Sequence, residues 1–508
     1  MLDESRWEYV SVIDRAGHSI RNDLYHKPEE VASYIIWKDG DKIYAKNGHT
    51  GQIEFSGTDA ASVIQQSINA LTAGRTWKEK VVLKGEFEVG SQINIPSYTI
   101  IEIQGKIRVP DGATLNLFWI EGENNVEIVG GILDGNKIGG TLTHLIVPSD
   151  GCSNVVIRNV KIINSGGTGI HIRAPNTANK NIQILNCHVE GCKSHGIDVR
   201  GATGIINEKI QILNCRLKNN AEFGIEYGEI FLMRCKDVIV ANNLIESSYG
   251  QGIKAETDVY NLIVANNIVK ECNGAGIVLG GGTPVKNVDI VNNYVENCGK
   301  SNNTCNINIT AGKPDYYDIN HINIINNIVI GSDAHGIILY GRRANIKHNI
   351  VIDSGMDRTN VGATYVGISV KGDYISIQGN LLYNPSKTID IGITAFGVDL
   401  PTDYISIVDN NILSGFTTPI SNYGAHSITK RNIGYVTENS GVATVSAGNS
   451  YVDVPHGLAG TPTKIIVTPK DSDPGDRFWI SDVGSSTFRI NLATAPATDK
   501  NFYWEAEI

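Results

Sequence analysis

The sequence predicts an all-β fold in which short parallel strands wind into a solenoid, that is, a parallel β-helix. The first observation is a repeat from about residue 153 to 436 with a mean period near 28 residues, nine steps separating Asn159 from Asn410. The second is that each copy holds two short runs of alternating apolar residues, a pattern typical of strands. The third is that so small a unit cannot bury its inner face alone, so neighbouring copies must stack.

An asparagine recurs at one place in these copies, and we expect it at an inward-facing turn. There its amide can bond the backbone of neighbouring coils. The set comprises Asn159, Asn186, Asn214, Asn242, Asn266, Asn292, Asn326 and Asn410. The buried isoleucine column is predicted to contain Ile197, Ile225, Ile253 and Ile277. Cysteines at equivalent coil positions are expected to stack as buried thiols, Cys187 with Cys215, and Cys192 with Cys272 and Cys298.

The flanking segments have different patterns. Residues 1–50 contain a hairpin-like stretch with an Asp39-Gly40 turn and are interpreted as a small appendage. Residues 58–71 predict an amphipathic helix with Thr58 as N-cap, which covers the open end of a solenoid spanning 51–436. Residues 437–508 predict a small antiparallel β-sandwich. Its Trp479 and Trp504 suit core packing better than a sugar-stacking surface, although both readings remain open.

Composition excludes several functions. The 508 residues carry a formal net charge of −10, whereas nucleic-acid binders usually show a basic footprint. No apolar run of 18 residues is present, so no membrane span is expected. The first ten residues lack the basic and then apolar pattern of a secretory signal.

The helix TDAASVIQQSINAL, followed by coils such as NNVEIVGGILDGN and Gly-Ile-x-Ile strands, resembles the pectate-lyase-like right-handed β-helix superfamily. That group includes polysaccharide lyases, mannuronan C5-epimerases, family 28 glycosidases and phage tailspikes. The resemblance covers residues 51–436 and implies a right-handed solenoid whose sugar groove lies on the outer face of one long sheet. It also implies an extracellular location, or one on a virion or cell surface, and an anionic polysaccharide as partner. Oligomeric state is left open.

The outward position x of the Gly-Ile-x-Ile strands gathers charge and imidazole on four successive coils. Because neighbouring residues of a strand face opposite sides, x points outward. Position x is occupied by His171, Asp198, Glu226 and Lys254. Two residues further along stand Arg173, Arg200 and Glu256, and His195 precedes one of the glycines. We interpret this cluster as functional; the alternative is a ladder of surface ion pairs.

These residue types suit removal of the C5 proton of a uronic acid, as in a polysaccharide lyase or a mannuronan C5-epimerase. That chemistry needs a base, a proton donor and cations that neutralise the carboxylate. The predicted catalytic residues are His171, His195, Asp198, Arg200, Glu226 and Lys254. His195 is the expected base, because an unperturbed imidazole titrates near pH 6.5. Lys254 is expected to neutralise the carboxylate or to transfer the second proton.

Asp198 is expected to position His195 or Arg200, and Glu226 to position Lys254. The segment His195-Gly196-Ile197-Asp198-Val199-Arg200 resembles the Tyr-Gly-x-Asp-Pro-His motif of mannuronan C5-epimerases only at its glycine and aspartate. The predicted substrate-binding residues are Arg173, Glu256, Tyr316, Tyr317 and Tyr365. The tyrosines lie in the longest coils, where they either wall the groove or belong to ordinary surface loops.

Two other functions remain open. Asp198 and Glu226 on adjacent coils predict a hydrolase if their carboxylates approach the roughly 5–5.5 Å of a retaining pair. A glycan-binding spike or adhesin without catalysis is the other alternative. No cofactor is expected to be required and no metal ligands are assigned, although Ca²⁺ bridging substrate to Asp198 and Glu226 is compatible with their oxygen ligands.

Overall fold

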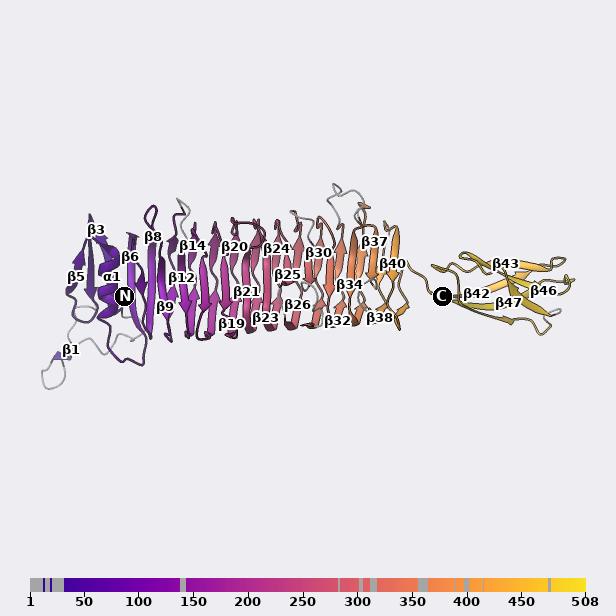
Figure 1. The fold of residues 1–508 in the computed structure, drawn as a ribbon, viewed down its shortest axis with the longest axis horizontal. Helices are drawn as coiled ribbons and strands as arrows, with labels where there is room; N and C mark the ends of the chain where they lie inside the picture. The colour runs from indigo at the N-terminus through magenta and orange to yellow at the C-terminus, as the bar shows by residue number, and fades with distance from the viewer. Residues whose placement is uncertain are drawn as a thin grey trace.

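The computed structural model describes residues 12–13, 19–20 and 32–508, except 138–142, 282–283, 301–304, 311–317, 355–363, 388, 397–401, 414 and 474–476. It shows a long parallel β-helix followed by a small β-domain (Figure 1). Strands pair in parallel with the equivalent strand of the next coil, and three such stacks form the faces of the solenoid.

The three stacks are called sheets 1, 2 and 3. Sheet 1 consists of β7 (Ile93–Asn94), β9 (Asn116–Glu121), β12 (His144–Ser149), β15 (Ile170–Ala174), β18 (Ile197–Gly201), the first parts of β21 (Gly228–Ala241) and β23 (Gln251–Ala265), β25 (Ile277–Gly280), β28 (Ile307–Thr310), β31 (Ile337–Tyr340), β34 (Val366–Lys371), β37 (Ile391–Ala395) and β40 (Thr418–Asn422).

Sheet 2 continues each coil. It consists of the first parts of β6 (Glu79–Glu88) and β8 (Thr99–Arg108), β10 (Glu127–Val129), β13 (Ser153–Arg158), β16 (Lys180–Leu185), β19 (Asn207–Leu213), the second parts of β21 and β23, β26 (Val285–Val291), β29 (Ile319–Ile325), β32 (Arg342–Lys347), β35 (Asp373–Gln378), β38 (Asp403–Val408) and β41 (Ile428–Lys430).

Sheet 3 is built from the shortest strands. It consists of the last parts of β6 and β8, β11 (Ile132–Asp134), β14 (Lys161–Ile163), β17 (His188–Glu190), β20 (Arg216–Lys218), β22 (Leu244–Glu246), β24 (Ile268–Lys270), β27 (Tyr294–Glu296), β30 (Ile328–Ile330), β33 (Ile350–Ile352), β36 (Leu381–Tyr383) and β39 (Asn411–Ile412).

The core is a set of aligned apolar columns running along the solenoid. Ile197, Ile253 and Ile277 are fully buried in one column, as predicted, but Ile225 is not a member. The register pairs Ile230 with both Ile197 and Ile253, and Ile230 is fully buried, whereas Ile225 lies half-buried in the preceding turn. Both Ile225 and Ile230 closely follow a glycine, so the sequence allows either one to align with Ile197, and only strand pairing shows that Ile230 does. All eight cysteines are free and buried.

The buried asparagine ladder differs from most of the predicted set. Asn159 and the six following members up to Asn326 are exposed and adopt left-handed backbone conformations, which asparagine tolerates well. From Asn242 to Asn326 the next residue of each is an asparagine that forms the ladder, in which each side-chain oxygen accepts the backbone N–H of the preceding member, and the predicted Asn410 belongs to the ladder itself. Its members are Asn243, Asn267, Asn293, Asn327, Asn349, Asn380, Asn410 and Asn432.

The N-terminal end of the solenoid is closed by a hairpin and a helix. β3 (Tyr34–Asp39), β4 (Lys42–Asn47) and β5 (Ile53–Gly57) are antiparallel, and β3 pairs in parallel with β6. Residues 34–47 therefore extend the solenoid core instead of forming a separate appendage. Helix α1 (Ala60–Asn69) is capped by Asp59, whose carboxylate accepts the Ala61 N–H at 3.0 Å, and not by Thr58. β1 (Val12–Ile13) and β2 (Ser19–Ile20) form a short antiparallel pair.

The C-terminal domain consists of two antiparallel three-stranded sheets. One contains β42 (Glu438–Val445), β47 (Lys500–Glu507) and β44 (Lys464–Pro469), and the other β43 (Tyr451–Pro455), β46 (Thr487–Leu492) and β45 (Phe478–Ser481). Trp504 is buried with Phe488 and Phe502 between them, whereas Trp479 is 45% exposed. Within the described residues, no helix has the length and apolarity to cross a membrane.

Candidate active site

The predicted cluster lies on the outer face of sheet 1, where strand pairing aligns its residues. The register places His171 beside Asp198, Asp198 beside Phe231, and Phe231 beside Lys254. A second column, two residues further along each strand, contains Arg173, Arg200, Met233 and Glu256. Because parallel strands are about 4.8 Å apart, side chains on successive coils can touch.

Phe231 occupies the place predicted for Glu226. Glu226 lies in the turn before β21, and its side chain is 81% exposed. It still reaches the cluster, because its carboxylate is 3.3 Å from Lys254 Nζ and its backbone oxygen accepts from Nζ at 3.0 Å. The Lys254 side chain is only 8% exposed, and its Nζ also lies 2.7 Å from Glu256. Lys254 is thus a buried ammonium held by two carboxylates.

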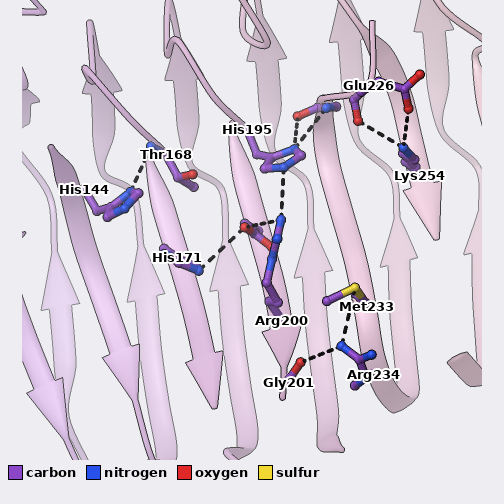
Figure 2. Close-up of polar contacts among 12 residues, drawn as sticks. His144, Thr168, His171, His195, Arg200, Gly201, Glu226, Met233, Arg234 and Lys254 are labelled. Carbon is purple, nitrogen blue, oxygen red and sulfur yellow. Dashed lines mark hydrogen bonds and ion pairs between the residues drawn. The ribbon is translucent and has the colours of Figure 1, made fainter. Parts of the chain in front are cut away.

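Asp198 connects the other half of the cluster. Its side chain is 4% exposed, and the Arg200 guanidinium contacts both oxygens, at 3.2 and 3.5 Å. Its Oδ2 is also 3.6 Å from His171 Nε2. The Arg200 side chain remains 42% exposed and lies over the Phe231 ring, 4.8 Å from its centroid. The cation is therefore accessible while its counter-ion Asp198 is buried. Figure 2 shows Arg200 with His171 and His195 nearby.

His195 is stacked on Phe231, with ring centroids 4.6 Å apart. Burial lowers its pKa to about 4, and nearby Asp198 opposes this shift while Arg200 adds to it. His195 thus does not have the unperturbed pKa on which its predicted role as base depends, and its imidazole is neutral at pH 7. Its Nδ1 lies 3.0 Å from the Gly228 N–H and 3.3 Å from the Gly228 oxygen, and its Nε2 faces Arg200 at 3.4 Å.

The contact between His195 Nδ1 and a backbone N–H of the next coil recurs on other coils, at the same register position. His144 Nδ1 accepts the Thr168 N–H at 3.0 Å, and His335 Nδ1 accepts the Val366 N–H at 3.0 Å. The repetition favours the tautomer of His195 whose Nδ1 lone pair is occupied by the backbone. In that state Nε2 carries the proton and faces the Arg200 guanidinium, which is itself a donor, so the two groups do not hydrogen-bond and the ring has no free lone pair with which to take a proton.

His171 is different, because neither of its ring nitrogens has a hydrogen-bond partner although both are buried. Burial lowers the pKa of His171 to about 3, and the positive charges of Arg200 and Arg173 lower it further. The His144 ring meets it edge-on, with centroids 4.8 Å apart. An unsatisfied buried polar group is rare in native proteins and is frequently explained by a functional role.

Several residues of this region were not predicted from the sequence. His144, whose pKa burial lowers to about 4, could have been found by aligning its coil with the coils of Thr168 and His195. Tyr227, whose ring is 5.1 Å from that of His195, follows an irregular turn that the repeat does not specify.

The predicted substrate-binding residues have different positions. The Arg173 guanidinium lies over the Trp119 ring at 5.6 Å, adjacent to the cluster. Tyr365 is buried and contacts Asp390 through its backbone N–H, so it does not wall a groove as predicted. Tyr316 and Tyr317 lie outside the described residues.

The carboxylates are paired with cations and not with each other. Asp198 contacts Arg200, and Glu226 contacts Lys254, so the predicted retaining pair and calcium ligands do not share one column. In the part of the chain that the structure describes, no three His, Cys, Asp or Glu side chains group in a way that could hold a metal ion.

Comparisons with known proteins agree with this architecture. Residues 146–317 match the family model described as "Right handed beta helix region". The fold is a right-handed parallel β-helix. A search of curated protein sequences finds no match to the chain.

Among solved structures, the A-module of mannuronan C-5 epimerase AlgE4 from Azotobacter vinelandii is 17% identical with a TM-score of 0.53, over 73% of this chain and 96% of that one. The A-module of AlgE6 from the same organism is 15% identical with a TM-score of 0.53, over 74% and 95%. A mutant tailspike protein of E. coli bacteriophage HK620, in complex with a pentasaccharide, is 12% identical with a TM-score of 0.56, over 89% and 90%. At these identities the likeness concerns the fold.

Proposed function

We propose that this protein removes the C5 proton of a uronic acid residue in an anionic polysaccharide, as a lyase or a C5-epimerase. The observation that carries the proposal is the exposed Arg200 guanidinium beside buried, neutral imidazoles on adjacent coils. A C5 proton becomes easier to remove when the adjacent carboxylate is neutralised, and Arg200 and Arg173 are placed to do this. The epimerase modules and the pentasaccharide-binding tailspike that share the fold support a role in glycan processing at a cell or virion surface.

We assign the base to His171 instead of His195. His171 has no hydrogen bond on either ring nitrogen, whereas the Nδ1 lone pair of His195 is directed at a backbone N–H. A uronate carboxylate bound to Arg200 and Arg173 offsets the charges that depress the pKa of His171, so the base strengthens when substrate is present. Both nitrogens of His171 are covered, and the proposal requires the ring to turn toward the sugar. Asp198 is then a positioning residue.

Lys254 lies three strands from His171 along sheet 1, about 14 Å at the usual strand spacing, so we assign it to the carboxylate of a neighbouring sugar and not to proton transfer at the same C5. In a lyase, the C5–H bond breaks with the proton going to His171, the C4–O bond breaks, and the leaving oxygen receives that proton from His171 while a C4=C5 double bond forms. In an epimerase, water instead returns a proton to C5 from the opposite face, and His171 releases its proton to solvent. Glu226 and Glu256 hold the Lys254 ammonium in place in both cases. Loss of one proton-transfer group costs roughly 10²–10⁴ in rate.

The test is an assay panel with alginate, pectate and hyaluronan. Ultraviolet absorbance of the new double bond detects a lyase, NMR of the polymer detects an epimerase, and new reducing ends without a double bond detect a hydrolase. His171→Ala should lose activity by the factor above, whereas Lys254→Ala should mainly raise KM. His335→Ala is the control, because it removes another largely buried imidazole at a distant coil of the solenoid. Turnover near wild type in His171→Ala would place the active site elsewhere.

Glycan binding without catalysis is the second candidate, and the ion pairing favours it. Asp198 with Arg200 and Lys254 with Glu256 already neutralise one another, as in a ladder of ion pairs. Retention of a polysaccharide with no product in any assay would support this candidate. A hydrolase with a retaining pair is less compatible with the geometry, because the coil neighbours of Asp198 are His171 and Phe231.

A further inference from the structure

We propose that the C-terminal domain carries a second glycan site, on the outer face of the sheet formed by β43, β46 and β45, which takes an uncharged, extended β-1,4-linked chain. This site is separate from the cluster on sheet 1, and the inference does not rest on the catalytic proposal. It starts from two exposed aromatic residues, Tyr451 and Trp479, that the core of the domain does not use.

The two rings are aligned across the sheet. Strand register places Tyr451 opposite Asn491, and Asn491 opposite Trp479, so the three side chains form one row on the same face. Tyr451 is 49% and Trp479 is 45% exposed, and the core side of these strands is already filled by Phe488, Phe502 and Trp504. Single exposed aromatics are ordinary, but two in one row on the same face favour a binding surface.

The row is held in place before any ligand arrives. The Arg489 guanidinium lies over the Tyr451 ring, 4.2 Å from its centroid. Asp453 accepts two hydrogen bonds from it, at 2.7 and 3.1 Å, and Asp482 contacts it at 2.8 Å. A ring that is fixed in advance loses little side-chain entropy on binding, which raises the affinity that its surface can provide.

The spacing of the rings selects the shape of the ligand. One strand, β46, lies between Tyr451 and Trp479, so their backbone positions are two strand spacings apart, about 9.5 Å, which is close to the two-residue repeat of an extended β-1,4-linked chain. In such a chain each sugar is turned over relative to the next, so the first and third sugars present the same C–H face to the two rings. The Asn491 side chain lies between the rings; its Nδ2 donates to Ser481 Oγ at 2.9 Å, and its oxygen can accept from a hydroxyl of the middle sugar.

The negative charge of this face disfavours the binding of an acidic glycan. Asp453 and Asp482 together exceed the charge of Arg489, with which they are paired. Residues 437–508 contain nine acidic and five basic residues, a net charge of −4 with histidine neutral. A polyanion is therefore repelled, in contrast to the neighbourhood of Arg200 and Arg173 on sheet 1.

The test is affinity electrophoresis of the full chain in gels containing hydroxyethylcellulose, xylan or glucomannan, with alginate gels as the anionic comparison. At least one neutral glycan should retard the wild-type protein. Trp479→Ala and Tyr451→Ala should each weaken that binding by about tenfold, as loss of an anchoring aromatic does. Tyr503→Ala is the matched control, because Tyr503 is 50% exposed on the other sheet of the same domain. Thermal unfolding of each variant verifies that the domain remains folded.

Three results would overturn the inference: no retardation by any neutral glycan, unchanged retardation of both variants, or an equal loss in Tyr503→Ala. Retardation in alginate alone would likewise refute it, since the proposed face excludes polyanions. The His171→Ala variant should bind the neutral glycan as wild type does, so a failure of the catalytic proposal leaves this result distinguishable.

Discussion

Asn293 and Asn292 are adjacent, identical side chains whose replacement by alanine should have very different effects. Asn293 is 1% exposed and belongs to the buried ladder, whereas Asn292 is exposed with a φ of 56°. The pair tests whether the buried ladder, and not the asparagine repeat as such, stabilises the solenoid.

The size of the effect follows from the contacts of each side chain. The Asn293 oxygen accepts the backbone N–H and the side-chain amide of Asn267, both at 3.0 Å. Its Nδ2 donates to the Val264 oxygen at 2.8 Å and to the side-chain oxygen of Asn327 at 3.0 Å. Four buried hydrogen bonds at about 1 kcal/mol each give a loss of about 4 kcal/mol for Asn293→Ala. Asn292→Ala should cost about 1 kcal/mol, the price of a left-handed alanine.

Urea unfolding of both variants measures the difference, and native-state amide exchange of the neighbouring coils locates it. Exchange should accelerate most at Asn267, whose N–H loses its acceptor, since coils of a solenoid contact only their neighbours. Equal losses in the two variants, or a larger loss in Asn292→Ala, would refute the reasoning.

Three further predictions concern the core, the imidazoles and the buried lysine. Ile230→Asp should prevent folding because it buries an unpaired charge, whereas Ile225→Asp in the half-buried turn should unfold thermally near the wild-type temperature; the reverse order would contradict the register. The free energy of unfolding should fall as pH drops from about 6.5 toward 4. In this range His144 is protonated in the unfolded chain but neutral in the folded protein, because burial lowers its pKa to about 4, so protons favour the unfolded state. His144→Asn should make the free energy of unfolding less dependent on pH in this range, and an unchanged slope would contradict the assignment. Glu256→Gln should destabilise the protein by about 1–3 kcal/mol in urea unfolding, since Lys254 then loses its shorter carboxylate contact; a neutral result would show that Glu226 suffices.

The sequence by itself determined the parallel β-helix, because a solenoid repeats its chemistry once per coil. Each coil must bury the same faces and turn at the same corners, so Ile197, Ile253 and Ile277 recur at positions that can be aligned by eye. The same regularity predicts the outward column that contains His171, Asp198 and Lys254.

Only the tertiary structure decided the positions of residues that the sequence repeat does not specify. The turn before β21 is longer than its neighbours, so strand pairing and not spacing placed Phe231 in the column and Glu226 beside it. Asn292 and Asn293 differ by one position in the sequence, and only Asn293 faces inward. Because successive side chains point to opposite faces, the repeat alone does not tell which of the two is buried. Whether a lone pair of an imidazole is occupied likewise depends on the next coil, because the Gly228 N–H is directed at His195 whereas, among the described residues, no group bonds the ring nitrogens of His171. Such contacts join residues far apart in the sequence, and no local pattern encodes them.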